Sequence, residues 1–286
     1  MSNFFKNDIF GSYQLACECL NDVDRTVAFK KSIVRLVNEN SNVLELGAGT
    51  GILSIIAASS GAKHVDAVEI TKIVAEIAKN NAVINGFGEK INIINKDALK
   101  LKKSDLSISP SLVIMEMIST GLIEELQVPA FNNLIKKKIV HSDSICCPSS
   151  FETSATLANV DYFFYGHEVR AILHQESWQR NLIKSEHSGK NRYNIVDFNE
   201  AIRSNTPVNA TVEKDLNFTI TKKGTINSLL ITSEAILDGN NKIGWTSAIN
   251  IPLILPINDK IVEKGDQITV KIKYQMGKGL ENLVVV

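Results

Sequence analysis

A glycine-rich loop at residues 47–51 is the strongest chemical signal in the sequence. The apolar run 42–46 leads into the pattern Gly-Ala-Gly-Thr-Gly, and a helical pattern follows directly. Glycines allow a tight turn and the close approach of a ligand, and the following helix presents free N–H groups. The loop therefore predicts a binding site for a nucleoside cofactor. The alternative is an ordinary glycine turn of an α/β domain.

Acidic residues accompany the loop at the ends of the expected strands. Glu45 precedes the loop, Glu69 follows Gly51 by eighteen residues, and Asp97 follows the third strand. An acid at position 69 can accept hydrogen bonds from both hydroxyls of a ribose. The GxGxG spacing, which differs from the dinucleotide pattern GxGxxG, favours S-adenosylmethionine, with Asp97 and Ala98 at its adenine edge. The expected cofactor-binding residues are Glu45, Gly47, Ala48, Gly49, Gly51, Ile52, Leu53, Glu69, Ile70, Asp97, Ala98 and Glu116.

Two glutamates nine residues apart form a second group. Glu116 directly follows the apolar run 112–115, and Glu125 comes after a turn that contains Gly121. Ligands of open α/β sheets bind at the carboxyl ends of the strands, so Glu116 is aimed at the reactive end of the cofactor. Two carboxylates facing one pocket repel unless a cation lies between them, and a guanidinium pairs with carboxylates bidentately. The pair predicts a cationic nitrogen substrate; the alternative is a helix start with favourable acids and a solvated Glu124–Glu125 pair.

The elements that must position these residues fall into two halves. Helical patterns alternate with short apolar runs between residues 25 and 145, which indicates βαβ units and a parallel sheet. From residue 151 onward, β-rich runs separated by turn signals predict an antiparallel β domain. The expected strands are 43–46, 65–68, 91–94, 112–115, 155–165, 216–221, 228–236, 249–254 and 267–274, and the expected helices are 27–37, 51–60 and 71–85; the stretch 178–206 is ambiguous.

Composition excludes several classes of protein. The 286 residues are 44% hydrophobic and 22% charged, which excludes wholesale disorder. The 31 basic and 31 acidic residues give no net charge, so we expect no nucleic-acid partner. No uncharged apolar run approaches the ~18 residues of a membrane span, and the N-terminus lacks a signal-peptide core. Four cysteines without a disulfide framework fit the cytoplasm, and without CxxC or HExxH motifs we expect no metal.

The sequence resembles the protein arginine methyltransferases. The resemblance is strong over residues 20–160 and traceable to the end of the chain. It is carried by LNDVDRT at 20–26, VLELGAGTGILS at 43–54, GAKHV at 61–65, Glu69, the spacing of Glu116 and Glu125, and Pro148 with Ala155-Thr156-Leu157.

The resemblance implies a doubly wound, Rossmann-like class I methyltransferase domain with N-terminal covering helices at residues 1–147. A β-barrel-like domain would follow at residues 148–286, with the active site between them. Arg25 would pair with the carboxylate of the cofactor's methionine part, and Glu116 and Glu125 would hold the acceptor guanidinium. The acceptor would be a small guanidino or amino compound, a peptide or a protein arginine, and a homodimer is compatible.

The chain departs from the family at residues that close the site. Phe10 and Lys6 stand where the family has tyrosines, and residues 243–245, Ile-Gly-Trp, replace Thr-His-Trp, although the usual partner of that histidine, Asp22, remains. Leu99 stands at the family's acidic adenine contact. These departures favour a small-molecule or short-peptide acceptor over arginine-rich protein tails. Three hypotheses stay open: a protein arginine methyltransferase, a small-molecule N-methyltransferase of specialised metabolism, and a non-catalytic cofactor-binding scaffold.

Overall fold

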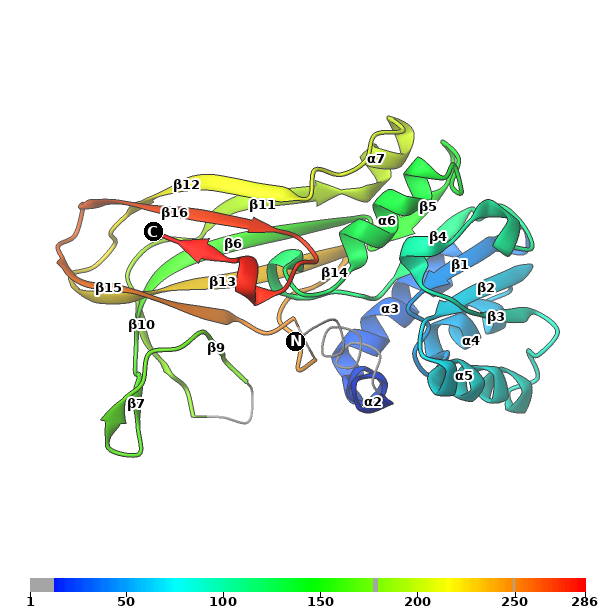
Figure 1. Ribbon diagram of the computed structural model, residues 1–286, viewed down its shortest axis with the longest axis horizontal. Coiled ribbons are helices and arrows are strands. Elements are labelled where there is room, and N and C mark those ends of the chain that lie inside the picture. Colours follow the sequence, from blue (N-terminus) through cyan, green and yellow to red (C-terminus); the bar gives the residue numbers. More distant parts are fainter. Residues whose placement is uncertain (1–12, 177–179, 249) are drawn as a thin grey trace.

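The computed structural model describes residues 13–176, 180–248 and 250–286 of the chain (Figure 1). Its N-terminal half contains a sheet of five parallel strands in the order β3-β2-β1-β4-β5. The strands are β1 (Asn42–Leu46), β2 (His64–Glu69), β3 (Ile91–Asn95), β4 (Leu112–Met115) and β5 (Ile145–Cys147). The strand order reverses at β1, so the carboxyl ends of β1 and β4 flank the switch point where open α/β sheets bind ligands.

Helices precede the parallel sheet and join its strands. They are α2 (Tyr13–Asn21), α3 (Val23–Leu36), α4 (Ile52–Ser59), α5 (Lys72–Ile84) and α6 (Gln127–Lys136), with 3₁₀ turns η1 (Ala98–Lys100), η2 (Lys103–Asp105) and η3 (Thr120–Leu122). α3 begins at Val23 because the Asp22 carboxylate accepts a hydrogen bond from the backbone N–H of Arg25 at 3.2 Å. Phe29 and Ile33, one helical turn apart, are fully buried and fix the inner face of α3.

Antiparallel strands form the C-terminal half. One sheet has the order β10-β6-β13-β15-β9, with β11 paired to β6 and β14 to β13, and a second has the order β12-β16-β17. Their bounds are β6 (Ser150–Val160), β9 (Leu173–His174), β10 (Ile183–Glu186), β11 (Asn191–Asp197), β12 (Thr211–Thr219), β13 (Gly224–Asp238), β14 (Asn241–Ile243), β15 (Leu253–Val262), β16 (Gln267–Gln275) and β17 (Val284–Val285), with α7 (Phe198–Arg203) and η4 (Leu280–Asn282) between strands.

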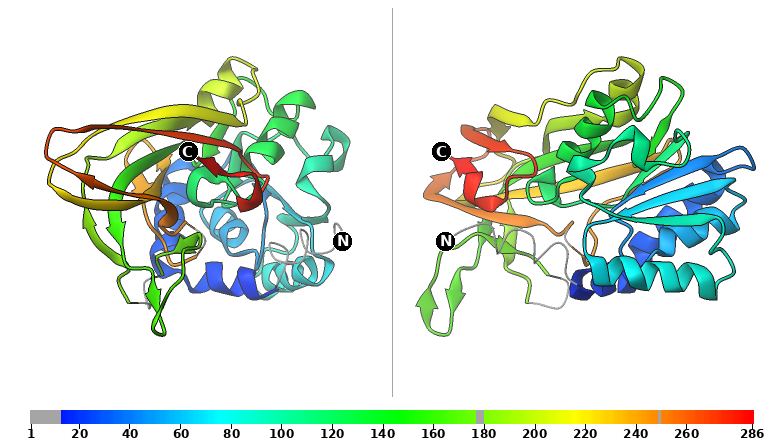
Figure 2. Two further views of the ribbon diagram at one scale, coloured as in Figure 1. Left: turned by 60° about the vertical axis from the view of Figure 1, so that its left-hand side comes forward. Right: turned by 45° about the vertical axis from the view of Figure 1, so that its right-hand side comes forward.

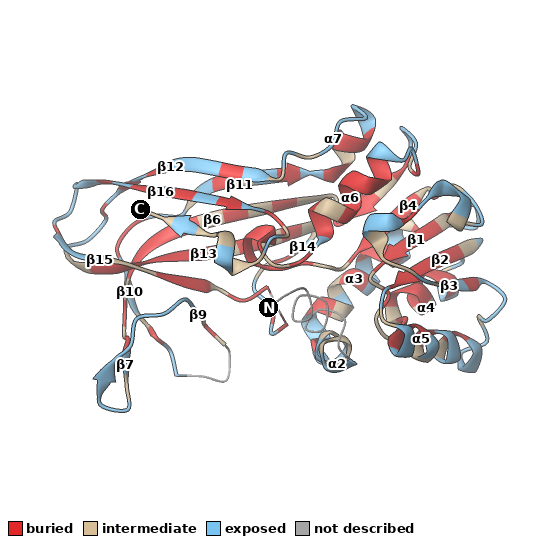
Figure 3. Cartoon of the chain, in the orientation of Figure 1, coloured by how far each residue is buried: buried red, intermediate tan, exposed pale blue. Residues whose placement is uncertain are grey.

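One buried cluster joins the two halves (Figure 3). Along β16 burial alternates with exposure, so one face of that strand packs into the core. Phe131 of α6 and Phe198 of α7 meet edge to face, with ring centroids 4.9 Å apart. The buried cluster includes both phenylalanines, so the parallel sheet and the β-rich half share one core.

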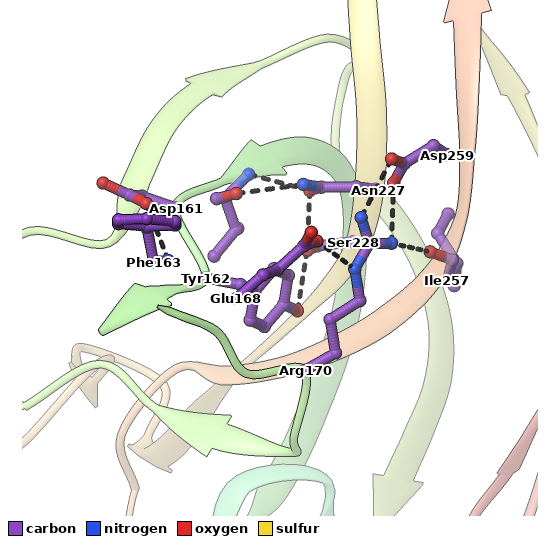
Figure 4. Close-up of polar contacts among 10 residues, drawn as sticks. Asp161, Tyr162, Phe163, Glu168, Arg170, Asn227, Ser228, Ile257 and Asp259 are labelled. Carbon is purple, nitrogen blue, oxygen red and sulfur yellow. Dashed lines mark hydrogen bonds and ion pairs between the residues drawn. The ribbon is translucent and has the colours of Figure 1, made fainter. Parts of the chain in front are cut away.

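A hairpin of β7 (Phe163–Phe164) and β8 (His167–Glu168) projects from the antiparallel sheet (Figures 1 and 2). Arg170 fixes its base: the guanidinium donates to Glu168 at 2.6 Å and to both carboxylate oxygens of Asp259 at 2.7 and 2.9 Å (Figure 4). The same guanidinium carbon lies 5.9 Å from the ring centroid of Tyr162, whose hydroxyl lies 2.9 Å from Ser228 Oγ.

The predicted α/β half followed by an antiparallel β half is confirmed. The first four strands lie where the apolar runs predict them, within one residue or two. The expected strand 249–254 is wrong over 250–252, because β15 begins only at Leu253, while Ala248 is bonded to Asp22 at the start of α3; residue 249 lies outside the described residues. The ambiguous stretch 178–206 contains β10, β11 and α7 among its described residues. No described helix is both long and apolar enough to span a membrane.

Candidate active site

A cavity of about 860 Å³ lies at the carboxyl ends of the parallel strands. Its walls come from α2, the glycine loop, the ends of β2 and β3, the two-glutamate loop and a turn near the C-terminus. Of the sequence-predicted residues, the cavity is lined by Glu45, Gly47, Ala48, Gly49, Ile52, Leu53, Glu69, Ile70, Asp97, Ala98, Glu116 and Glu125. Gly51 and Arg25 are not part of the lining.

The glycine loop is held on the end of β2. The backbone N–H groups of Gly47 and Ala48 both donate to the carbonyl of Val68 at 2.9 Å. Gly47 has a φ of 75°, and a Cβ atom there would lie 2.9 Å from Cγ of Met117. Gly51, with a φ of 82°, faces α5 instead, where a Cβ atom would lie 3.2 Å from that of Ala78. The first glycine thus shapes the cavity, whereas the third lets two helices approach.

The carboxylate of Glu69 is bonded to this loop, and that of Glu45 is bonded to α4, the helix that follows it. Glu69 accepts hydrogen bonds from the backbone N–H groups of Gly49 at 3.0 Å and Thr71 at 2.8 Å. Burial raises the pKa of Glu69, and these hydrogen bonds act in the opposite direction. Each carboxylate oxygen has a second lone pair, so Glu69 can still accept bonds from a ligand. Glu45 accepts a hydrogen bond from the hydroxyl of Ser54, and burial raises the pKa of Glu45 to about 8.

Asp97 lines the cavity beyond β3. Its carboxylate accepts a hydrogen bond from the backbone N–H of Leu99 at 2.8 Å, which caps the 3₁₀ turn η1. Leu99 itself lines the cavity beside Ala98. Asp97 therefore both fixes this turn and presents an acidic edge to the cavity.

The two-glutamate loop brings Glu116 and Glu125 to the same cavity. Burial raises the pKa of Glu125 to about 7, and the positive charge of Arg25 partly opposes that rise. The hydroxyl of Ser119 accepts hydrogen bonds from the backbone N–H groups of Glu124 at 3.2 Å and Glu125 at 3.0 Å. These bonds fix the backbone of the loop at Glu124 and Glu125.

The β half also holds this loop. Thr120 donates its hydroxyl to the carbonyl of Ile251 at 2.5 Å, and the N–H of Gly121 donates to Ser233 Oγ at 2.8 Å. The position of Glu125 therefore depends on contacts from both halves of the chain.

Arg25 contacts Glu116 but does not line the cavity, and it is completely buried. Its Nε donates to the Glu116 carboxylate, Nη2 donates to the Glu116 carbonyl at 2.9 Å, and Nη1 donates to the Ala248 carbonyl at 2.6 Å. Asp22 accepts a hydrogen bond from the N–H of Ala248 at 3.0 Å. With Gly244 in place of a histidine, Asp22 thus binds the backbone of the same loop a few residues later.

Comparisons with known proteins place this chain in a family. Residues 16–138 match the family described as ribosomal protein L11 methyltransferase (PrmA). The uncharacterized protein MJ1452 of Methanocaldococcus jannaschii is 30% identical over 268 residues, which are 93% of each chain. The chain belongs to the family of that archaeal protein.

Two further matches concern arginine methyltransferases. An arginine N(omega)-methyltransferase of Streptomyces achromogenes is 29% identical over 143 residues, which are 50% of this chain but only 39% of that protein. The solved structure of a Trypanosoma brucei PRMT1 enzyme-prozyme heterotetrameric complex with AdoHcy matches with a TM-score of 0.74 and 18% identity, over 93% of this chain and 89% of that one.

The protein is an arginine methyltransferase-like class I methyltransferase. Its cofactor is S-adenosylmethionine, as the glycine loop predicts. The fold expected from the resemblance, a Rossmann-like domain followed by a β-barrel-like one, is confirmed by the solved structures and by the two sheet types. The part of the methyltransferase that the structure describes contains no cluster of three metal-ligating side chains.

The resemblance implies N-terminal covering helices, and Leu15, Ala16, Cys19 and Leu20 of α2 line one side of the methyltransferase's cavity. Sequence reasoning missed another wall, which residues 277–281 form. The closely spaced glycines of Gly-Lys-Gly near the C-terminus could have indicated it. Lys6 and Phe10, which stand in place of the family's tyrosines, lie outside the described residues.

Replacing Glu69 tests whether the acid at the end of β2 binds the nucleoside. We expect Glu69→Gln to lower the affinity for S-adenosylmethionine by roughly 10- to 100-fold, because a hydrogen bond to a charged group contributes about 1.5–3 kcal/mol. Calorimetric titration measures the affinity, and thermal unfolding checks that the glycine loop still folds. Glu76→Gln, on the exposed face of α5, is the control that should bind like the parent protein. Unchanged affinity in Glu69→Gln would remove Glu69 from the cofactor site.

Proposed function

We propose that this methyltransferase transfers a methyl group to a guanidinium or amino nitrogen held by Glu116 and Glu125. The observation that carries the proposal is that both carboxylates line the same cavity as the glycine loop. Burying an ionised carboxylate is costly unless a cation compensates it, and burial is the main cause of the raised pKa of Glu125. The Streptomyces relative named as an arginine N(omega)-methyltransferase supports a guanidinium acceptor.

The cavity fits S-adenosylmethionine at its glycine end. Ligand pockets for molecules of this size are typically ~300–1,000 Å³, and the cavity here is about 860 Å³. We assign the backbone around Gly47 and Gly49 to the amino-acid part, Glu69 to the ribose and Asp97 to the adenine edge. Arg25 does not line the cavity, so it would bind the cofactor's carboxylate only by exchanging the bond that its guanidinium makes to Glu116.

The residues of the chain would then act by positioning. When bound, the cofactor supplies an electrophilic methyl group on a sulfonium. Glu116 and Glu125 accept N–H bonds from the acceptor and aim its lone pair along the line of displacement. They also stabilise the positive charge that grows on the nitrogen, and no covalent enzyme intermediate is required. A carboxylate of this pair is available to take the proton that the methylated nitrogen releases.

Three further features belong to the proposal. We assign cofactor binding and the two glutamates that hold the acceptor to residues 1–147, and a β-barrel-like substrate domain to residues 148–286, of which 277–281 line the cavity. A homodimer is compatible with the heterotetrameric assembly named for the trypanosomal relative. A cytoplasmic location is supported by the four cysteines, all of which are free thiols.

A screen with isotope-labelled S-adenosylmethionine tests the proposed reaction. The acceptors are free arginine, free lysine, small guanidino compounds and a glycine-arginine-rich peptide, with methylation read by mass spectrometry. We expect methylation of at least one cationic nitrogen. The methylation rate should fall at least 100-fold in Glu116→Gln and stay unchanged in Glu76→Gln. The affinity of Glu116→Gln for S-adenosylhomocysteine should stay within about threefold of the parent. Full turnover by Glu116→Gln would show that the two-glutamate loop is structural only.

The raised pKa of Glu125 predicts how acceptor binding depends on pH. A guanidinium binds the ionised carboxylate and stays charged over this range, so affinity should rise as pH increases toward about 7 and level off above it. The same shift makes the unliganded fold lose stability as pH rises from the ordinary pKa of a glutamate to about 7. Titration of the acceptor into protein saturated with S-adenosylhomocysteine measures the first effect. Glu125→Gln should abolish the slope; a slope that survives in this variant would assign the titration to another group.

A further inference from the structure

A turn near the C-terminus, Gly277–Glu281, closes the cavity beside the two-glutamate loop. The N–H of Gly277 donates to the carbonyl of Leu122 at 2.9 Å, and that of Gly279 donates to the carbonyl of Ile123 at 3.0 Å. These backbone bonds fix the turn onto the loop that carries Glu125.

The two glycines permit this approach. Both have positive φ angles, 76° at Gly277 and 83° at Gly279, which side chains rarely allow. A Cβ atom on Gly277 would lie 2.7 Å from Cγ of Pro129 and 3.3 Å from the carbonyl oxygen of Glu125. The turn therefore touches the backbone of a proposed acceptor-binding residue.

Lys278 stands between these glycines, exposed and lining the cavity. The cavity has one other basic lining residue among those described, Lys96, which is paired with Asp105 at 2.7 Å. Within the described part of the chain, the ammonium of Lys278 has no ion-pair partner. A cavity with Glu116 and Glu125 on its wall thus also presents one unpaired cation.

The ammonium of Lys278 is unfavourable for binding an acceptor that carries only positive charge. Like charges in one cavity repel, so Lys278 would weaken the binding of the guanidinium that the glutamates attract. The conflict disappears if the acceptor carries a negative group as well. A lysine ammonium is a compact point charge that pairs with a carboxylate.

We propose that Lys278 binds the carboxylate of the acceptor, so that the substrate is a free guanidino or amino acid. An arginine inside a polypeptide has no carboxylate to offer at that position, and a polycationic tail would meet an additional positive charge. The inference rests on the proposed function and names the substrate class of the same site.

Arginine and argininamide test the proposal, because they differ only in the carboxylate; lysine and lysinamide form a second pair. Calorimetry on protein loaded with S-adenosylhomocysteine measures affinity, and labelled cofactor measures kcat/KM. We expect the free acid of the preferred pair to bind at least tenfold more tightly than its amide. Lys278→Ala should lose that preference, chiefly because it binds the free acid more weakly, and Lys278→Glu should reverse it. Lys278→Arg should retain it, which a merely structural role of Lys278 would not require.

Lys273→Ala is the matched control, since Lys273 is exposed on β16 and paired with Glu213 at 3.0 Å outside the cavity. It should behave like the parent protein. Affinity for S-adenosylhomocysteine should be the same in Lys278→Ala, because we assign the cofactor's carboxylate to Arg25.

Three results would overturn the inference while the methyltransferase function stands. They are equal use of acid and amide by the parent protein, methylation of an internal peptide arginine but of neither free amino acid, and a loss in Lys278→Ala confined to S-adenosylhomocysteine. Absence of both cofactor binding and methylation of any acceptor would instead overturn the proposed function.

Discussion

The structure depends on a guanidinium with no access to solvent. Arg25 is completely buried, and its three nitrogens are satisfied by the carboxylate and carbonyl of Glu116 and by the carbonyl of Ala248. Removing one partner of a buried ion pair typically costs about 3–5 kcal/mol, because the other charge is left uncompensated. The helix, the loop after β4 and the loop before β15 are therefore held by a single side chain, and Asp22 adds a second bond to the last of these loops.

The charge balance of the cavity follows from that arrangement. Arg25 pairs with Glu116, whereas the Glu125 carboxylate has no such partner at hydrogen-bond distance among the described residues, and burial raises its pKa to about 7 although the charge of Arg25 opposes the rise. A cationic acceptor would supply the missing charge on the cavity side. Glu45, with its pKa raised to about 8, is protonated near neutral pH and serves as a hydrogen-bonding partner of Ser54. Acids in one cavity thus differ in protonation because their surroundings differ.

The sequence was sufficient for the parts of the fold and site that local patterns determine. Apolar runs located β1 to β4, and the glycine loop with Glu69 located one wall of the cavity, because strand, turn and helix start are adjacent in the chain. The loop before β15 could not be predicted, since its position depends on bonds from Asp22 and Arg25 to Ala248, more than two hundred residues away. The same holds for the turn around Lys278, whose backbone bonds to Leu122 and Ile123 exist only in the folded chain.

The three glycines of the loop belong to one sequence motif but have different roles in the structure. Gly47 and Gly49 line the cavity, but Gly51 packs against Ala78 of α5 and only permits the helices to meet. A spacing rule assigns the three glycines to one ligand, whereas the structure gives them different neighbours. Likewise the histidine missing at Gly244 leaves Asp22 fully engaged, because a backbone N–H at Ala248 takes its place.

We propose that Arg25, which is paired with Glu116, binds the cofactor's carboxylate and so couples the cofactor site to the acceptor site. The most direct test of this central claim is calorimetry of S-adenosylmethionine and of adenosine, which lacks the carboxylate, with Arg25→Lys and Arg25→Ala, after thermal unfolding has shown that each variant folds. The account predicts that both variants bind S-adenosylmethionine at least tenfold more weakly while adenosine binds as it does to the parent protein. An equal loss for both ligands would mean that Arg25 supports only the fold, and would contradict the claim.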